Sequence, residues 1–303
     1  MVVNIVIHIL LALMMPPLLI GVINRTKALM AGRRGAPLLQ PYFELARLWR
    51  KGSVFSRTTS WLFRAGPLVA LAATLLAASL VPFGGHNPPV AFVGDLVLFA
   101  YLFALARFFT TLAALDTGSS FEGMGAAREV TFGCLTEPVL FLVLVALARE
   151  SGSLSLNGLL SHASGEMWPY GAAALLLMVG ALFILLLAEN CRIPFDDPTT
   201  HLELTMIHEV MVLDHSGPAF GLILYGAALK LFVLGALVLH VALPFGIGEG
   251  LLGWLAFCVG MLLLSVAVGL VESVMARLRL LQVPRLLVAA AALAAFALLL
   301  TVR

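Results

Sequence analysis

Charged residues are scarce in this chain of 303 residues: they make up 11% of the sequence, whereas hydrophobic residues make up 61%. Because a soluble domain carries roughly 25% charged residues, the chain lacks the charge that would cover a water-soluble globule. A hydrocarbon core ~30 Å thick needs ~20 apolar residues per spanning helix, and the sequence supplies such runs repeatedly. In lipid the backbone must satisfy its own hydrogen bonds, which runs of this length achieve as helices. The predicted fold is an all-α integral membrane protein with a single polytopic domain over residues 1–303.

Cysteine is also rare. Cys134, Cys191 and Cys258 lie far apart and form no CxxC pair. They cannot by themselves hold an iron–sulfur cluster or a zinc ion, and free cysteine usually behaves as a small hydrophobe. The sequence therefore predicts three inert, buried thiols and no cofactor in this chain.

Motifs for bond chemistry are missing as well. His208-Glu209 begins like the HExxH of zinc proteases, but Val212 stands in place of the second histidine. His201, His208 and His215 recur every seven residues, which on a helix separates successive side chains by ~10 Å. That spacing is too wide for a shared metal ion with bonds of ~2 Å. There is no Gly-rich nucleotide loop, and the net charge of +2 gives no indication of nucleic-acid binding. The chain is predicted to be non-catalytic alone, without a metal site.

Eight apolar runs are predicted to span the membrane. They cover residues 2–23, 62–81, 90–115, 130–148, 170–188, 218–243, 251–271 and 283–302. Proline inside a helix removes an N–H and clashes with the preceding turn. Pro16-Pro17 is therefore expected to bend or locally break the first span.

The distribution of lysine and arginine predicts the orientation. Half of the 18 basic residues lie between Arg25 and Arg64, in the first loop. The third, fifth and seventh loops also carry arginines, whereas the second and sixth have no basic residue and the fourth has only Arg149. Excess Lys and Arg mark the cytoplasmic side of a membrane. Every odd loop is therefore predicted to be cytoplasmic, and both termini are predicted to lie outside.

The first loop contains a predicted amphipathic helix. Between Leu38 and Trp49 the apolar residues fall on one face, with Arg47 and Arg50 interleaved. This pattern fits a helix that lies in the membrane interface. It fits equally a connector helix that packs on its own bundle.

The fifth loop contains a second predicted helix. Asp197 followed by Pro198 reads as an N-cap and a first helical position, since proline has no N–H to lose there. We expect this helix to run to about Leu213, with His201 and His208 on one face.

Charges inside the predicted spans are costly and usually face partners or a water-filled path. Arg107 lies nine residues before Asp116, and Glu137 lies nine residues after Arg128. At ~1.5 Å per residue both are ~13 Å deep from the same side. An Arg107–Glu137 pair is thus geometrically allowed, either as a static ion pair or as part of a proton path. Lys230 lies near the bilayer middle, where it either snorkels to the surface or has a functional role.

Acidic residues crowd the cytoplasmic end of the fifth and sixth spans: Glu189, Asp196, Asp197, Glu203, Glu209 and Asp214. Clustered carboxylates repel one another, so some of their pKa values are expected to rise. A solvated acidic loop is the alternative. Apolar neighbours such as Phe195 favour partial burial.

Several of these stretches resemble a known family. Residues 189–196, Glu-Asn-Cys-Arg-Ile-Pro-Phe-Asp, look like the ExxRxPFD segment of the quinone-site membrane subunit of respiratory complex I. Glu203 matches a later acidic position of that loop, and Arg33-Arg34-Gly35 with Leu-Gln-Pro at 39–41 is similar to its first-loop motif. The resemblance covers nearly the whole chain and implies the same eight-span fold.

Other details are similar to the hydrogenase branch of that family. Leu-Asp-Thr-Gly-Ser at 115–119 and Gly-Ala-Ala-Arg-Glu at 125–129 resemble hydrogenase-4 and formate hydrogenlyase membrane subunits, as does the run from His208 to Gly217. The complex I loop tends to be acidic where this chain has Thr199 and His201. Because this is the loop that lines the quinone cavity, the departure puts quinone binding in doubt.

The resemblance implies a coupling role. Hydrogenase large and small subunits would hold the nickel–iron centre, and these with an iron–sulfur subunit would hold the clusters. This chain would anchor that arm in a prokaryotic cytoplasmic membrane and join it to antiporter-like membrane subunits. The residues expected to form the proton path or coupling site are Arg107, Glu129, Glu137, Glu189, Asp196, Asp197, His201, Glu203, His208, Glu209, Asp214, Lys230 and Glu272. The residues expected at the docking surface are Arg33, Arg34, Arg192, Pro194, Phe195 and His215.

Two other classes of function stay open. One is the quinone-site subunit of an NADH or ferredoxin dehydrogenase. The other is a stand-alone ion transporter, which the lack of an evident inverted repeat disfavours.

Overall fold

Long apolar helices form almost the whole molecule in the computed structural model, which describes residues 2–165, 168–196, 206–243 and 250–301. Eight helices in these ranges are long and apolar enough to cross a membrane. They are α1 (Val2–Met30), α3 (Trp61–Leu80), α4 (Asp95–Asp116), α5 (Ser120–Ser151), α7 (Trp168–Glu189), α8 (Gly217–Ala242), α9 (Leu251–Val274) and α10 (Val283–Thr301). The predicted fold class and the eight spans are confirmed. The largest differences from the predicted bounds are in α1, which continues to Met30, and in α5, which begins at Ser120.

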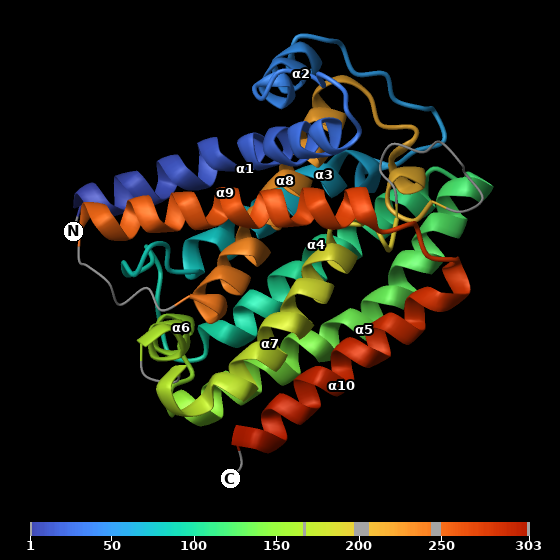
Figure 1. Cartoon of the computed structure of the whole chain (residues 1–303). Helices are drawn as coiled ribbons and strands as arrows, with labels where there is room; N and C mark the ends of the chain where they lie inside the picture. Colours follow the sequence, from blue (N-terminus) through green and yellow to red (C-terminus); the bar gives the residue numbers. More distant parts are fainter. Residues whose placement is uncertain (1, 166–167, 197–205, 244–249, 302–303) are drawn as a thin grey trace.

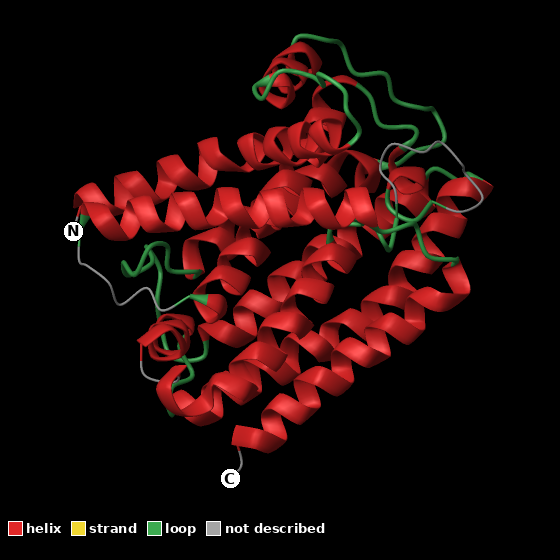
Figure 2. Ribbon diagram, viewed as in Figure 1, coloured by secondary structure: helices red, strands yellow, loops and turns green. Residues whose placement is uncertain are grey.

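Shorter helices fill the connections. They are α2 (Gln40–Trp49), α6 (Leu156–Gly165) and two 3₁₀ turns, η1 (Glu209–Val212) and η2 (Leu280–Gln282). In Figure 2 helices and loops account for all the described ribbon. The one β-type pairing among the described residues is an isolated bridge between Phe83 and His86.

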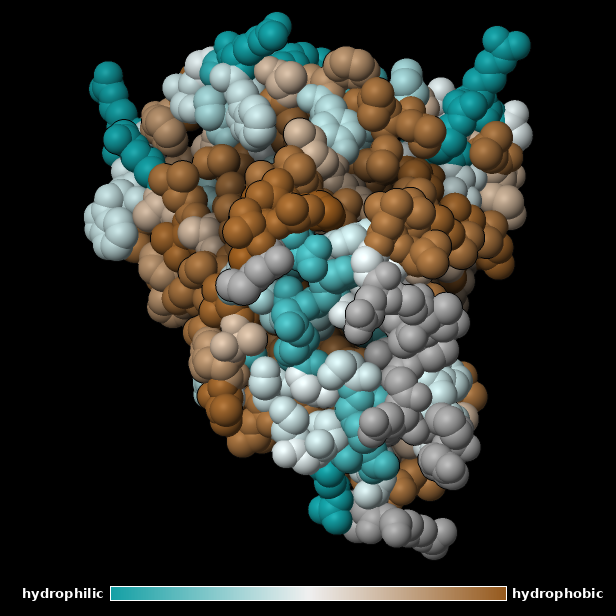
Figure 3. All heavy atoms as spheres, turned by 90° about the vertical axis from the view of Figure 1, so that its left-hand side faces the viewer, coloured by the Kyte–Doolittle hydropathy of each residue, from teal (hydrophilic) through white to brown (hydrophobic). Residues whose placement is uncertain are grey.

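The helices form one bundle with two distinct ends. α1 packs against α8 and α9, α3 packs against α4 and α8, and α10 packs against α5 and α7. Figure 1 shows the odd-numbered connections gathered at one end, and α6 and both chain termini at the other. Figure 3 looks onto this second end, where hydrophilic atoms gather in the middle, below a broad area of hydrophobic side chains. Successive connections thus lie at alternating ends of the bundle, as eight spans require. Which end faces the cytoplasm stays a prediction.

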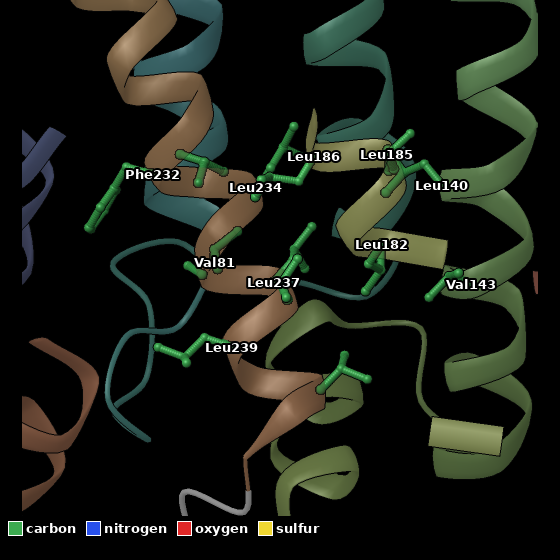
Figure 4. Packing of buried hydrophobic residues seen from close by; sticks show 14 of the residues in the cluster. Val81, Leu140, Val143, Leu182, Leu185, Leu186, Phe232, Leu234, Leu237 and Leu239 are labelled. Atoms are coloured by element: carbon green, nitrogen blue, oxygen red, sulfur yellow. The ribbon is translucent and has the colours of Figure 1, made fainter. Parts of the chain in front are cut away.

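Interdigitated aliphatic side chains fill the centre of the bundle. Leu140 of α5, Leu182 and Leu186 of α7, and Leu234 of α8 lie on one side of α8 in this core, whereas Phe232 points to its other side (Figure 4). Lipid tails are as apolar as leucine, so helices in a membrane associate mainly through close packing. The core therefore stabilises the bundle by the fit of its side chains.

Of the bend or local break expected at Pro16 and Pro17, the break does not occur, because α1 is continuous through both prolines. Each proline leaves the carbonyl four residues earlier without an intrahelical donor. The Tyr225 hydroxyl lies 3.4 Å from the carbonyl oxygen of Ala12 and donates to that of Leu13 at 3.0 Å. A neighbouring helix thus satisfies the freed backbone groups, which is how membrane helices tolerate proline.

The first-loop helix packs on its own bundle. α2 contacts α1 and α8, and the Tyr42 hydroxyl donates to the carbonyl of Met14. Gly221 of α8 faces the Trp49 indole so closely that a Cβ there would lie 2.9 Å from Nε1. Phe43 and Trp49 still expose large apolar surfaces. The connector reading of this helix is therefore correct, with an apolar outer face left over.

The expected helix in the fifth loop is wrong over its described part. Its predicted start at Asp197 lies outside the described residues, but 206–208 are not helical and only the 3₁₀ turn Glu209–Val212 follows. The backbone N–H of Ile207 donates to Asp196 Oδ2 at 2.7 Å. A side chain thus takes the amide that an α-helix would direct to a carbonyl four residues earlier.

Candidate ion-coupling site

An arginine inside the membrane region gathers three carboxylates. Arg107 of α4 makes ion pairs with Glu137 of α5 and Glu189 of α7, and its Nε lies 3.4 Å from Glu129 Oε1. The Arg107 side chain is only 9% exposed. The Arg107–Glu137 pair allowed by depth therefore exists, as part of a larger network. A buried cation is costly unless it is paired, and three partners supply that pairing.

The Glu189 carboxylate lies between two cations. On one side is Arg107, and on the other the Lys230 ammonium of α8 lies 2.5 Å from Glu189 Oε2. The Thr136 hydroxyl donates to Glu189 Oε1. Lys230 is thus paired inside the bundle, which excludes the snorkelling alternative for this conformation. Four helices, α4, α5, α7 and α8, contribute one charged group or more.

A glycine makes room for this network. A Cβ at Gly133, one turn after Glu129, would lie 2.8 Å from Arg107 Nη1. Any larger residue at this position would displace the guanidinium from its carboxylates. The network holds three carboxylates and two cations, so its net charge is −1 when all are ionised.

Two small cavities flank the network. One is lined by Glu129, Thr136 and Glu189, the other by Arg107, Glu137 and Glu189, and each has a volume of about 20 Å³ for a water-sized molecule. A water needs roughly 10–15 Å³ and at least two polar partners. Each cavity can therefore hold a water that bridges the carboxylates.

A second ion cluster ties the fifth loop to α1 and α9. Glu272 of α9 is fully buried and lies 2.8 Å from Lys27 Nζ and 3.3 Å from Arg192 Nη1. Asp196 Oδ1 lies 2.6 Å from Arg277 Nη2. Of the carboxylates predicted to repel one another, Glu189 and Asp196 instead face cations from other elements of the structure.

Burial sets the charge state of two loop histidines. The His215 ring stacks on Phe63 with 3.9 Å between ring centroids, and burial lowers its pKa from 6.5 to about 4. Burial also lowers the pKa of His208, against the opposing effect of the Glu129 carboxylate. Both side chains favour the neutral imidazole in the folded chain.

His208 also takes part in a cluster of metal-ligating groups. One nitrogen of His208, one carboxylate oxygen of Glu129 and the sulfur of Cys191 all lie within 4.8 Å of one another. Burial raises the pKa of the Cys191 thiol well above 9, and nearby carboxylates raise it further. The prediction of three buried thiols is wrong for Cys134, which is exposed, while Cys191 and Cys258 are half-buried.

Two other predicted coupling residues, Glu209 and Asp214, lie at the η1 turn and just after it. Glu209 begins η1, and Asp214 is exposed, with its backbone N–H donating to Glu122 Oε1 at 3.1 Å. Asp197, His201 and Glu203 lie outside the described residues.

The predicted docking residues divide into two groups. Arg33 and Arg34 are exposed in the first loop. The remaining four are buried: Arg192, Pro194, Phe195 and His215. We therefore expect those four to shape the fifth loop from within, while the two arginines are free to contact a partner.

Sequence reasoning missed several residues of these clusters: Thr136, Cys191, Lys27, Arg277 and Glu122. Glu122 could have been found, because it is a carboxylate in the first turn of a span. The others become partners only through contacts between distant parts of the chain, which spacing cannot predict.

Comparison with known proteins shows to which family the chain belongs. The chain matches the NADH dehydrogenase family over residues 3–303. It is 34% identical to formate hydrogenlyase subunit 4 of Escherichia coli (strain K12), with 89% of each chain covered. It is 35% identical to hydrogenase-4 component C of the same organism, over 77% of this chain and 73% of that protein. An NADH-quinone oxidoreductase membrane subunit of Rubrobacter xylanophilus is 30% identical over 63% of this chain and 57% of that protein.

The fold also recurs in a solved structure. A chain of the membrane-bound sulfane sulfur reductase, an archaeal respiratory membrane complex, superposes with a TM-score of 0.82 at 23% identity, covering 99% of this chain and 98% of that one. The family resemblance of the loop motifs, including that to hydrogenase-4 and formate hydrogenlyase subunits, is confirmed by these matches. The eight-helix chain with its buried ion network belongs to the NADH dehydrogenase subunit 1 family of membrane subunits.

Proposed function

We propose that this chain is the membrane anchor and coupling subunit of a complex I-related nickel–iron hydrogenase of the group 4 type. It would link a soluble redox arm to the translocation of protons or sodium ions. Formate hydrogenlyase and hydrogenase-4 subunits match more of the chain, and at higher identity, than the Rubrobacter NADH-quinone oxidoreductase subunit does. This difference favours the hydrogenase branch over complex I.

The observation that carries the proposal is the buried ion network. Arg107, Glu189 and Lys230 meet inside the bundle, with the half-exposed Glu137 beside Arg107 and Glu129 at the edge towards the fifth loop. Ionisable groups at membrane depth are expensive and usually mark an ion path. A change of charge or shape in the fifth loop could reach these carboxylates through Glu129, which gives the coupling a physical route.

The chemistry is divided between subunits in this proposal. The nickel–iron centre and the iron–sulfur clusters belong to the hydrogenase large and small subunits and an iron–sulfur subunit. Antiporter-like membrane subunits adjoin this chain in the cytoplasmic membrane of a prokaryote. This chain supplies the docking end and the buried charges, and it is not catalytic alone.

Affinity purification of the tagged chain from native membranes tests the assignment. We expect a large subunit with bound nickel and hydrogen turnover with artificial electron donors to copurify. An NADH- or ferredoxin-oxidising arm with bound quinone would contradict the proposal and establish the complex I alternative. Ion flux through liposomes that contain the purified chain alone would instead favour the stand-alone transporter.

Docking of the arm is tested by charge reversal in the fifth loop. Asp196→Lys places a cation beside Arg277 and removes the acceptor of the Ile207 amide, so the loop should lose its shape and release the arm. Glu150→Lys is the control, because Glu150 is exposed in the last turn of α5. This end of α5 contacts α6, at the end of the bundle away from the fifth loop (Figure 1). We expect hydrogenase activity to leave the membrane fraction only in Asp196→Lys, with both chains still inserted. Activity retained in the membranes of Asp196→Lys would count against docking at this loop.

A further inference from the structure

Three side chains of different chemistry converge from three separate segments. Glu129 lies on α5, Cys191 in the turn after α7, and His208 just before η1. Their ligand atoms lie within 4.8 Å of one another. In a tetrahedral zinc site with bonds of ~2.0–2.3 Å the ligand atoms stand ~3.3–3.8 Å apart. Small side-chain rotations would bring these three to that separation. We propose that Glu129, Cys191 and His208 form a binding site for a thiophilic divalent cation, with Zn²⁺ as the best match.

The backbone at Cys191 supports a role for its side chain. Cys191 has a φ of 47°, and it is the one non-glycine residue with positive φ among those described. The Arg192 N–H donates to the Leu187 carbonyl at 2.8 Å, which is the six-to-one bond of a Schellman helix end. Glycine is the usual residue at such a position, and other residues there carry strain. A cysteine kept in this conformation is explained if its sulfur is needed where it lies.

Charge balance favours a dication at this place. The adjoining network has a net charge of −1 from three carboxylates and two cations. On binding, the Cys191 thiol loses its proton to solvent and the sulfur bonds to the metal, because a coordinating cysteine is a thiolate. The thiolate brings the net charge to −2, and a dication then neutralises the whole cluster.

A fourth ligand has room in the neighbouring cavity. The cavity lined by Glu129, Cys191 and Ile207 has a volume of about 20 Å³ for a water-sized molecule, which suffices for one water. Three protein ligands with one water is a common zinc arrangement. Thiolate and imidazole ligands favour zinc over magnesium or calcium.

This site is not the shared metal site of His201, His208 and His215 that their spacing excludes. The three histidines at seven-residue intervals would have had to share one helix, and His215 instead stacks on Phe63. Cys191 lies 62 residues after Glu129 and 17 residues before His208 along the chain, so only the fold brings the three ligands together. The inference does not require the proposed function, since this chain provides all three ligands.

Cobalt binding to the purified full-length chain in detergent tests the site. We expect one Co²⁺ per chain, with a thiolate-to-cobalt charge-transfer absorption that Zn²⁺ abolishes by displacement and Mg²⁺ does not. Cys191→Gly should lose this absorption completely. Glycine suits the positive φ at this position, so this variant removes the sulfur without adding strain.

Matched variants make the result decisive. Cys134→Ser and Cys258→Ser should keep the absorption, because neither cysteine belongs to the cluster. His208→Gln should weaken Co²⁺ binding, and thermal unfolding of each variant shows that it is folded. Absence of the absorption in the wild-type chain, or its persistence in Cys191→Gly, would overturn the proposal.

Discussion

Arg107 shows how one residue decides what a substitution near it can do. If Glu137 were its only partner, removal of Glu137 would strand a buried cation at a cost of ~3–5 kcal/mol. Arg107 also contacts Glu129 and Glu189, so Glu137→Gln leaves two carboxylates in place. Conversely, replacing both Arg107 and Glu137 by apolar residues is not neutral, because Glu129 would lose its cation. The single variant is therefore the cleaner probe.

His215 gives a prediction about pH. Burial lowers its pKa from 6.5 to about 4, so the unfolded chain binds this proton at a higher pH than the folded chain. The contribution of neutral His215 to the free energy of unfolding is complete above pH 6.5 and is lost as the pH falls towards 4. The total loss of stability is about 3 kcal/mol. Thermal unfolding in detergent between pH 7.5 and 4.5 should show a shallower loss of stability in His215→Phe than in the wild type.

A control histidine separates this effect from general acid sensitivity. His86 also stacks on an aromatic ring, that of Trp254. It belongs to the connection between α3 and α4, at the end of the bundle away from the fifth loop (Figure 1). His86→Phe keeps His215 and should keep the wild-type slope. Equal slopes for the wild type and His215→Phe would show that the buried imidazole does not govern acid stability.

For single residues, the sequence predicts only part of the ion-coupling site. Arg107 and Glu137 could be paired because depth follows from counting residues along a helix. The contacts of Glu189 with Lys230, and of Glu129 with Cys191, depend on how α5, α7 and α8 are placed around one another. No local pattern encodes that placement.

Among the helices and loops, the first loop is held in place by close packing of Leu38 against Gly21 of α1. A Cβ at Gly21 of α1 would lie 2.0 Å from the carbonyl oxygen of Leu38. Gly21→Ala must therefore move the backbone before α2, and overpacking of this kind costs ~1–3 kcal/mol. We expect a lower unfolding temperature and faster cleavage by trypsin at Arg33 and Arg34.

Gly226→Ala is the matched control for this prediction. Gly226 is also inside a spanning helix, and its added Cβ would meet only Leu71 Cδ1 at 3.9 Å. Alanine is favoured over glycine in a helix by about 1 kcal/mol, so this variant should be as stable as the wild type or more so. If Gly21→Ala were equally stable and equally resistant to trypsin, the first loop would not be packed as described.

The elements also show where pattern reading succeeds and fails. Eight spans follow from hydropathy because each must bury its backbone in lipid. The fifth-loop helix fails because Asp196 takes the Ile207 amide. Of the bend or local break expected at Pro16 and Pro17, the break does not occur because Tyr225 donates to the freed carbonyls. In both cases a side chain distant from the local pattern decides the backbone.

For the whole molecule, the prediction concerns its orientation. The odd-numbered connections share one end of the bundle and carry most of the basic residues, so that end should face the cytoplasm. Reporters fused after Lys51 or Arg279 should be active in the cytoplasm, and one inserted between Gly84 and Pro88 should be active outside. A cytoplasmic signal from the Gly84–Pro88 insertion would overturn the orientation.

We propose that the buried ion network couples the redox arm to ion movement. Glu137 is the member best suited to a test, because its side chain is 44% exposed in the isolated chain and Arg107 keeps two other carboxylates without it. A glutamine has nearly the same shape but cannot carry the charge or release a proton at neutral pH.

The most direct measurement compares membrane-potential generation by the assembled complex in wild type, Glu137→Gln and the control Glu150→Gln. Assembly and hydrogen turnover with artificial donors are recorded in parallel. We predict that all three complexes assemble and turn over hydrogen, and that only Glu137→Gln fails to generate a membrane potential. A fully assembled Glu137→Gln complex that generates the wild-type potential would contradict the account and leave the network as a structural scaffold.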